Sequence, residues 1–240
     1  MAVSGETPFR NRVLGGLTTA ERAILAGHLE LHSLRSGSVL SEPGARMNDV
    51  WFPETGVASL LALMADGHQV ETGTVGYEGI VGLPLFLGTD RWPGRVIWQV
   101  PGAAYRMTAA AFELLLRGSP GFRARVAVAA ELQMVQMAQS VACNRLHPVE
   151  QRLARWLLMT HDRAGQDAFM LTQEFLALML GIRRASVNGA AGRLKAEGVL
   201  TYRRGFVTIL DRRRLEAAAC TCYGIVDAET RRLMANGAGA

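Results

Sequence analysis

Residues 171–210 read LTQEFLALMLGIRRASVNGAAGRLKAEGVLTYRRGFVTIL, and this stretch decides the fold of the C-terminal part of the chain. Apolar residues recur at helical spacing on either side of Gly181, which predicts two helices joined by a tight turn. After Gly198, two apolar runs flank Arg203, Arg204 and Gly205, a pattern typical of a β-hairpin. This order predicts a winged helix-turn-helix, whose second helix enters the major groove of DNA.

The charge distribution favours the same interpretation. Between Arg183 and Arg214 the chain carries nine Lys or Arg residues and two acidic ones, a local net charge of +7. The whole chain has a net charge of +5, and residues 1–149 hold 12 basic and 12 acidic side chains. The positive excess is therefore local, as expected of a surface that meets phosphates. The alternative is an ordinary helical hairpin with a solvated basic face.

Length and composition bound the remaining possibilities. With 240 residues, 49% of them hydrophobic, the chain can form one large domain or two smaller ones. We expect no membrane association, because no apolar run reaches the roughly 18–20 residues of a membrane span. The N-terminus lacks a secretory signal pattern, and three cysteines are too few for a disulfide framework. We therefore expect a cytoplasmic protein.

Residues 31–107 have a different texture, with short apolar runs separated by Gly, Pro, Asp and Ser. This spacing predicts an antiparallel β-roll of the double-stranded jelly-roll type, and Asp66-Gly67 marks one hairpin turn. The expected strands are Val39–Leu40, Val50–Phe52, Val57–Met64, Gln69–Val75, Arg95–Val100 and Ala103–Met107.

A long helix is predicted from about Phe122 to Leu146, with apolar residues at alternating spacings of four and three. This heptad pattern favours pairing with a second copy of the chain, although a helix packed on its own domain remains the alternative. The expected dimer interface is Val128, Leu132, Val135, Gln139 and Ala142. A second apolar stripe contains Met134, Met137 and Val141 and could face the β-roll or a partner.

His147-Pro148 ends that helix and marks a domain boundary. The chain is thus expected to be an α+β protein with three parts. These are a β-roll sensor domain (residues 1–118), a dimerisation helix (119–147) and a winged helix-turn-helix DNA-binding domain (148–240).

Taken together, this order of elements resembles the Crp/Fnr family of transcription regulators. The resemblance rests on VWFPETGVASLLALMADGHQVETGTVGYEGIVG (residues 50–82) and LTQEFLALMLGIRRASVNGAAGRLKAEGVL (residues 171–200). It implies a homodimer that binds double-stranded DNA at a palindromic operator, with two recognition helices about one helical turn apart. It also implies a signal that is sensed in the β-roll and relayed through the long helix. A contact with RNA polymerase is left open.

The resemblance places Arg184 at the arginine that starts the family's common base-reading motif. Ala185 and Gly189 stand where that motif usually has a glutamate and a second arginine, so the family's usual operator is not assumed. The residues expected to contact DNA are Thr172, Gln173, Arg183, Arg184, Ser186, Val187, Asn188, Arg193, Arg203 and Arg204. Among these, Thr172, Gln173 and the two wing arginines are expected at phosphates.

The family's cyclic-nucleotide site has no clear counterpart. Its Gly-Glu pair aligns with Gly82-Leu83, its Arg-Ser pair falls near Pro93-Gly94, and its base-reading hydroxyls align near Met137. A buried phosphate needs a paired arginine, so cAMP is not expected and no cofactor is assigned. The effector pocket, if present, is expected to include Glu78, Gly82, Leu83, Arg91, Pro93, Gly94, Arg95 and Met137.

Other chemistry lacks sequence support. Cys220 and Cys222 alone cannot complete a tetrahedral metal site, and no third ligand is evident for His28 and His32, so no metal site is predicted. The competing hypothesis is a cupin-like β-roll that binds a small molecule or acts as an enzyme, with a C-terminal assembly domain. Because no His-x-His or catalytic triad pattern occurs, we expect a transcription regulator rather than an enzyme.

Overall fold

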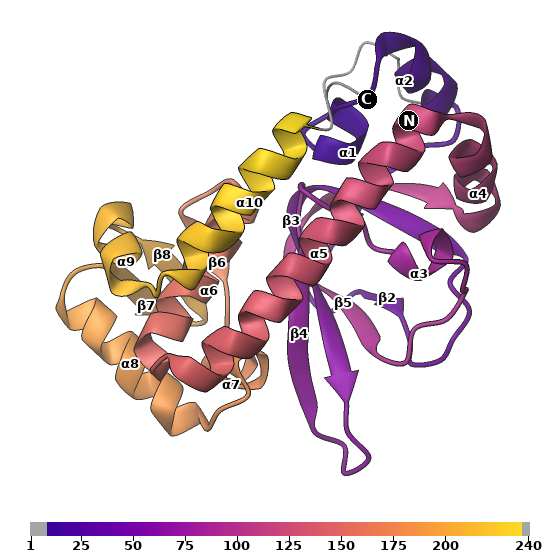
Figure 1. Ribbon diagram of the computed structural model, residues 1–240. Helices are drawn as coiled ribbons and strands as arrows, with labels where there is room; N and C mark the ends of the chain where they lie inside the picture. The colour runs from indigo at the N-terminus through magenta and orange to yellow at the C-terminus, as the bar shows by residue number, and fades with distance from the viewer. Residues whose placement is uncertain (1–8, 237–240) are drawn as a thin grey trace.

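The computed structural model describes residues 9–236. Its N-terminal part is an antiparallel β-roll, and its C-terminal part is a helical domain with a small sheet (Figure 1). The long helix α5 (Pro120–Leu146) crosses the β-roll and leads to the helical domain (Figure 1). The α+β class and the order β-roll, long helix, helix-turn-helix are therefore confirmed.

The β-roll contains five strands in one antiparallel sheet. They are β1 (Glu30–Leu34), β2 (Val39–Ser41), β3 (Asp49–Leu63), β4 (Gln69–Val75) and β5 (Arg95–Thr108). The order is β1-β5-β3-β4, and β2 also pairs with β5. The predicted hairpin at Asp66-Gly67 joins β3 to β4, and Gly67 has the positive φ of +85° that this turn requires.

Two long strands replace four of the short ones expected from the sequence. The two runs on either side of Pro53–Gly56 form the single strand β3, and those on either side of Pro101-Gly102 form β5. The register shifts between Pro53 and Ala58, where Gly56 has a φ of +84°. A Cβ at Gly56 would lie 2.5 Å from the carbonyl oxygen of Val100, so only glycine fits this crossing. The strand β1 was not predicted.

Four short helices pack against the β-roll. They are α1 (Arg12–Gly15), α2 (Thr19–Ala26), α3 (Leu83–Phe86) and α4 (Ala109–Gly118). Thr18 and Glu21 form a capping box that starts α2. Their apolar faces and the first half of β3 bury Phe52, Phe112 and Phe122 completely, forming one of the hydrophobic cores.

The C-terminal domain begins with α6 (Val149–Ala164), directly after the predicted break at His147-Pro148. It continues with β6 (Ala168–Met170), α7 (Gln173–Leu180), α8 (Arg184–Ala196), β7 (Leu200–Arg203), β8 (Phe206–Ile209) and α9 (Arg212–Ala218). The sheet has the order β6-β8-β7, so the predicted wing hairpin gains a third strand, β6, that was not predicted. Leu153, Val187 and Leu194 are fully buried in the core of this domain.

The last helix, α10 (Cys222–Asn236), was also not predicted. It leaves the C-terminal domain and runs beside α5 toward the β-roll (Figure 1). Arg232 of α10 lies 4.0 Å from Glu131 of α5, and Gln139 of α5 donates a hydrogen bond to the Cys222 thiol. Part of the apolar seam predicted for a dimer therefore has an intrachain neighbour, and Leu132 is only 5% exposed.

Candidate nucleic-acid interface and β-roll cavity

The helix-turn-helix is built from local signals in the sequence. Thr172 caps α7, because its hydroxyl accepts a hydrogen bond from the Phe175 amide at 3.1 Å. Gly181 ends α7 in the left-handed conformation, with φ +61° and ψ +40°. The chain then turns, and Arg183 stands immediately before the first residue of α8. The N-terminal turn of α8 is consequently held at a fixed angle to α7.

Most of the side chains expected at DNA are exposed in this geometry. On α8 and its N-cap, Arg183, Arg184, Ser186 and Asn188 all face solvent. Val187 is the exception: its side chain is 0% exposed and packs in the domain core, so the prediction that it contacts DNA is wrong. Successive residues of an α-helix point about 100° apart, so Ser186 and Asn188 are exposed while Val187, between them, points into the core.

The wing is a two-residue hairpin. Arg203 pairs with Phe206, and Arg204 and Gly205 form the turn with φ values of +49° and +82°. Positive φ at both central residues is the type I′ turn, which matches the twist of the strands. Arg204 is the only non-glycine residue with positive φ among residues 9–236, and both Arg203 and Arg204 are exposed.

Tyr202 joins the wing to the helix-turn-helix. Its hydroxyl donates to the Leu171 carbonyl at 2.5 Å, and the Leu171 amide donates to the Gly205 carbonyl at 2.6 Å. Burial raises the pKa of Tyr202, while Gln173 and the charge of Arg184 lower it to a smaller extent. The start of α7, the start of α8 and the wing are therefore close to one another.

Arg193 differs from the other basic residues of this face. Its guanidinium forms an ion pair with Glu150 of α6, although its side chain is 58% exposed. Thr172 is exposed at the start of α7, and Gln173 is half-buried. Arginines without an intrachain carboxylate are better placed to meet phosphate than one that already has a counter-ion.

A separate apolar cavity of about 210 Å³ lies between the β-roll and α5. Its walls come from β3, the segment around α3, and Ala130, Gln133, Met134 and Met137 of α5. Trp92 also lines it, and its indole nitrogen is buried without a hydrogen-bond partner. Among residues 9–236, no charged side chain lines this cavity.

The residues expected for an effector pocket do not all lie together. Gly82, Leu83 and Met137 line the apolar cavity, whereas Pro93 and Gly94 lie outside its lining. Arg95 forms an ion pair with Glu42 at 2.9 Å, and Arg91 donates to the Gly44 carbonyl at 2.7 Å. Glu78 is also elsewhere: it forms a buried ion pair of 2.7 Å with Arg163 of α6.

The Glu78–Arg163 pair belongs to a polar contact between the β-roll and α6. Arg163 also donates to the Thr74 hydroxyl at 2.7 Å. Burial tends to raise the pKa of Glu78, but the adjacent Arg163 outweighs it and holds this pKa below the usual value. This contact fixes α6 against β4.

Glu71 makes a second contact across the same boundary. Its carboxylate accepts hydrogen bonds from Trp156 of α6 and from Ser59 of β3, each at 2.8 Å. Burial raises the pKa of Glu71 to about 7, because these hydrogen bonds and the nearby arginines only partly offset the loss of water. Sequence reasoning missed Glu71, since no motif marks it.

Comparison with known proteins agrees with this architecture. Residues 151–218 match the family model of the Crp-like helix-turn-helix domain. No curated protein matches the chain in sequence. Within residues 9–236, none of the helices combines the length and apolar character needed to cross a membrane.

Several solved structures are similar over nearly their full length. FixK2 from Bradyrhizobium japonicum is 14% identical with a TM-score of 0.67, covering 80% of this chain and 98% of FixK2. A putative transcriptional regulator of the Crp/Fnr family from Eubacterium rectale is 16% identical with a TM-score of 0.64, covering 84% and 94%. TTHB099, a CRP-family regulator from Thermus thermophilus, is 18% identical with a TM-score of 0.66, covering 78% and 96%.

The chain has the Crp/Fnr fold. The resemblance inferred from the two quoted segments is thus confirmed for the overall fold and for the Crp-like DNA-binding domain. The wing and recognition helix described above lie within the residues that the family model matches.

Proposed function

We propose that this protein is a homodimeric transcription regulator that binds a palindromic DNA site. The main support is the exposed cluster formed by Arg183 and Arg184 at the start of α8 and Arg203 and Arg204 at the wing. A recognition helix needs its first turn free to enter the major groove, and a wing needs cations at its tip to meet phosphate. Both conditions hold here, whereas among the described residues no His or carboxylate lines the cavity, as a cupin-like metal site would require.

Within this proposal, Arg184 reads bases together with Ser186 and Asn188. An arginine can donate two hydrogen bonds to one guanine edge, which discriminates between bases by about 1–3 kcal/mol. Arg203 and Arg204 contribute charge at the backbone and carry little sequence information. Thr172 and Gln173 add phosphate contacts at the start of α7, and Arg193 contributes after it exchanges Glu150 for phosphate.

The dimer is proposed to form through the face of α5 that neither the β-roll nor α10 covers. Val141 is 72% exposed on this face, and Met134, one heptad earlier, is 64% exposed at its edge, where it also borders the cavity. The proposed dimer contact is therefore centred beside the predicted heptad seam, which contains Val128, Val135 and Ala142. Leu132 and Gln139 face α10 and would contribute indirectly.

The β-roll cavity is proposed to bind an apolar effector rather than a cyclic nucleotide. An uncharged wall cannot compensate a phosphate, whereas burial of apolar surface contributes about 25 cal/mol per Å². The unpartnered indole N–H of Trp92 would donate a hydrogen bond to one acceptor atom of such a molecule. Because α5 supplies part of the cavity wall, an effector bound in the cavity would contact the same helix that is proposed to form the dimer.

The test is selection of bound DNA fragments by the purified full-length protein at near-physiological salt. The wild type is expected to yield a two-fold symmetric consensus. Arg184→Ala should relax base preference at one position in each half-site. Arg203→Ala should weaken binding to all sequences alike and reduce the salt slope by about two, one for the wing of each protomer. Arg35→Ala, an exposed arginine of the β-roll, is the control and should change neither. An unchanged consensus for Arg184→Ala would contradict the proposed reading.

A further inference from the structure

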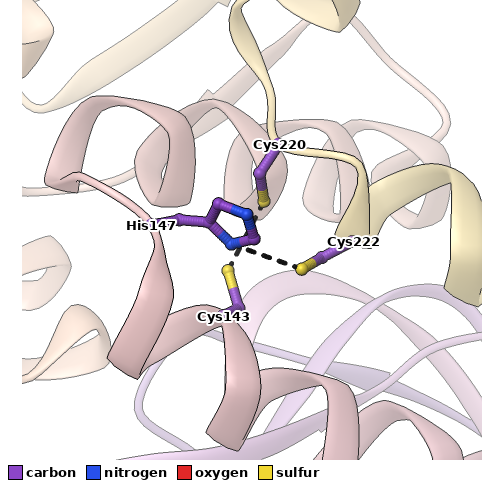
Figure 2. A group of neighbouring side chains, drawn as sticks. All are labelled: Cys143, His147, Cys220 and Cys222. Carbon is purple, nitrogen blue, oxygen red and sulfur yellow. Dashed lines mark hydrogen bonds between the residues drawn. The ribbon is translucent and has the colours of Figure 1, made fainter.

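Two pairs of side chains that are far apart in sequence converge where α5 ends and α10 begins. We call them the thiol–imidazole cluster, and they are Cys143, His147, Cys220 and Cys222. Figure 2 shows them pointing toward one another from the end of α5, the residue after it, and the chain entering α10. The three cysteines are no more than 5% exposed.

Two of the separations between donor atoms match those of a tetrahedral metal site, and all four donor atoms lie close together. The sulfur atoms of Cys143 and Cys220 are 3.5 Å apart, and the Cys222 sulfur is 3.5 Å from Nδ1 of His147. All four donor atoms lie within 4.8 Å of one another. With zinc–sulfur bonds of about 2.3 Å and zinc–nitrogen bonds of about 2.0 Å, a tetrahedron separates two sulfurs by about 3.7 Å and sulfur from nitrogen by about 3.5 Å.

The surroundings suit thiolates bound to a cation. Gln139 donates a hydrogen bond to the Cys222 sulfur at 3.1 Å, the kind of contact that orients a metal-bound thiolate. Arg152 and Arg155 border the same region, beside Cys143. Three thiolates and one Zn²⁺ carry a net charge of −1, and these guanidinium groups provide the balancing positive charge.

We propose that the thiol–imidazole cluster is a Zn²⁺ site that fastens α10 to the end of α5. A Cys₃His donor set with all four positions filled by protein is typical of structural zinc, and three thiolates select a soft cation over Mg²⁺ or Ca²⁺. One ion would join α10 to the junction between α5 and the Crp-like domain. The site thereby holds α10 along α5 and limits the movement of the DNA-binding domain relative to the β-roll.

The first test is the metal content of the full-length protein, purified under reducing conditions without chelator. Elemental analysis is expected to find one zinc ion per chain. Exchange with Co²⁺ should give the visible absorption of a tetrahedral site and a thiolate-to-cobalt charge-transfer band. A protein without stoichiometric zinc that also lacks this cobalt spectrum would overturn the proposal, as would a Cys143–Cys220 disulfide in protein that binds neither ion.

A pair of histidine variants separates ligation from packing. His147→Gln removes one ligand and should weaken zinc binding by more than the roughly 10–100-fold typical of losing a neighbouring hydrogen bond. His28→Gln changes an exposed histidine in a turn of the β-roll and should keep one zinc with unchanged affinity. Circular dichroism checks that both variants are folded. Equal zinc affinity in the folded His147→Gln variant and the wild type would refute the role of His147 as a ligand. The cobalt spectrum of the wild type tests whether the cysteine thiolates bind the metal, so this test does not depend on cysteine variants that fail to fold.

Discussion

The buried carboxyl of Glu71 should make the stability of this protein depend on pH in the neutral range. Glu71 lies on β4 and accepts hydrogen bonds from Trp156 and Ser59, so it connects the β-roll to the Crp-like domain. Its pKa in the folded protein is raised to about 7, from an ordinary value of 4.5. Between about pH 4.5 and 7, Glu71 therefore stays protonated in the folded protein but is ionised in the unfolded chain.

The sign and size of the effect follow from this difference in pKa. Because the pKa of Glu71 is raised in the folded state, Glu71 contributes to the free energy of unfolding. This stabilising contribution is complete below about pH 4.5 and is lost as the pH rises through about 7. One pKa unit corresponds to about 1.36 kcal/mol, so the shift of Glu71 amounts to at most about 3 kcal/mol in the free energy of unfolding. Glu71→Gln resembles the protonated carboxyl at every pH and should abolish this dependence.

The assay is chemical denaturation of the wild type and of Glu71→Gln at about pH 5 and about pH 8. The two proteins should have similar stability at the lower pH, and the variant should be more stable at the higher pH. Glu78→Gln is the matched control, because Arg163 lowers the pKa of Glu78. That variant should be less stable than the wild type at neutral pH, with a difference that shrinks as the pH falls. A Glu71→Gln curve parallel to the wild type at all pH values would refute this reasoning.

Three further predictions concern the turn, the dimer and the domain contact. Gly181→Ala should lower the free energy of unfolding by about 1–2 kcal/mol, because an alanine is strained at a φ of +61°. Gly192→Ala, inside α8 with open space around it, should instead raise the free energy of unfolding by up to about 1 kcal/mol. Urea denaturation measures both changes. Val141→Glu should yield a monomer in analytical ultracentrifugation, while Leu114→Glu, an equally apolar and exposed change on α4, should leave the dimer intact. Arg163→Ala leaves Glu78 buried and unpaired, so thermal denaturation near neutral pH should show a loss of about 3–5 kcal/mol, and a loss below 1 kcal/mol would contradict a buried pair.

The DNA-binding domain could be predicted closely from its residues because its signals are local. The cap at Thr172, the left-handed Gly181 and the turn at Arg204-Gly205 each act within a few residues of sequence. Helical spacing also predicted α5 and its end at His147-Pro148. Where the prediction of this domain failed, tertiary packing decided the outcome. The strand β6 pairs with the distant β8, and Val187, which belongs to the apolar period of α8 as well as to its first turn, is buried in the core.

The antiparallel β-roll was predicted from the sequence, but the bounds and number of its strands were not. Its strands pair over long sequence distances, so two short runs separated by Pro and Gly could equally be two strands or one irregular strand. The crossing at Gly56 and Val100 resolves this, because it depends on how closely two distant backbones approach.

The sequence by itself determined the order of the elements, the winged helix-turn-helix and the location of its positive charge, since periodicity, turn residues and composition are properties of short segments. Only the tertiary structure decided which groups meet across long separations. Glu71 reaches Trp156, and Cys143 meets Cys220, 77 residues further along the chain, because α10 returns along α5. No local pattern marks such meetings, because the free energy that selects them comes from packing whole helices and sheets together.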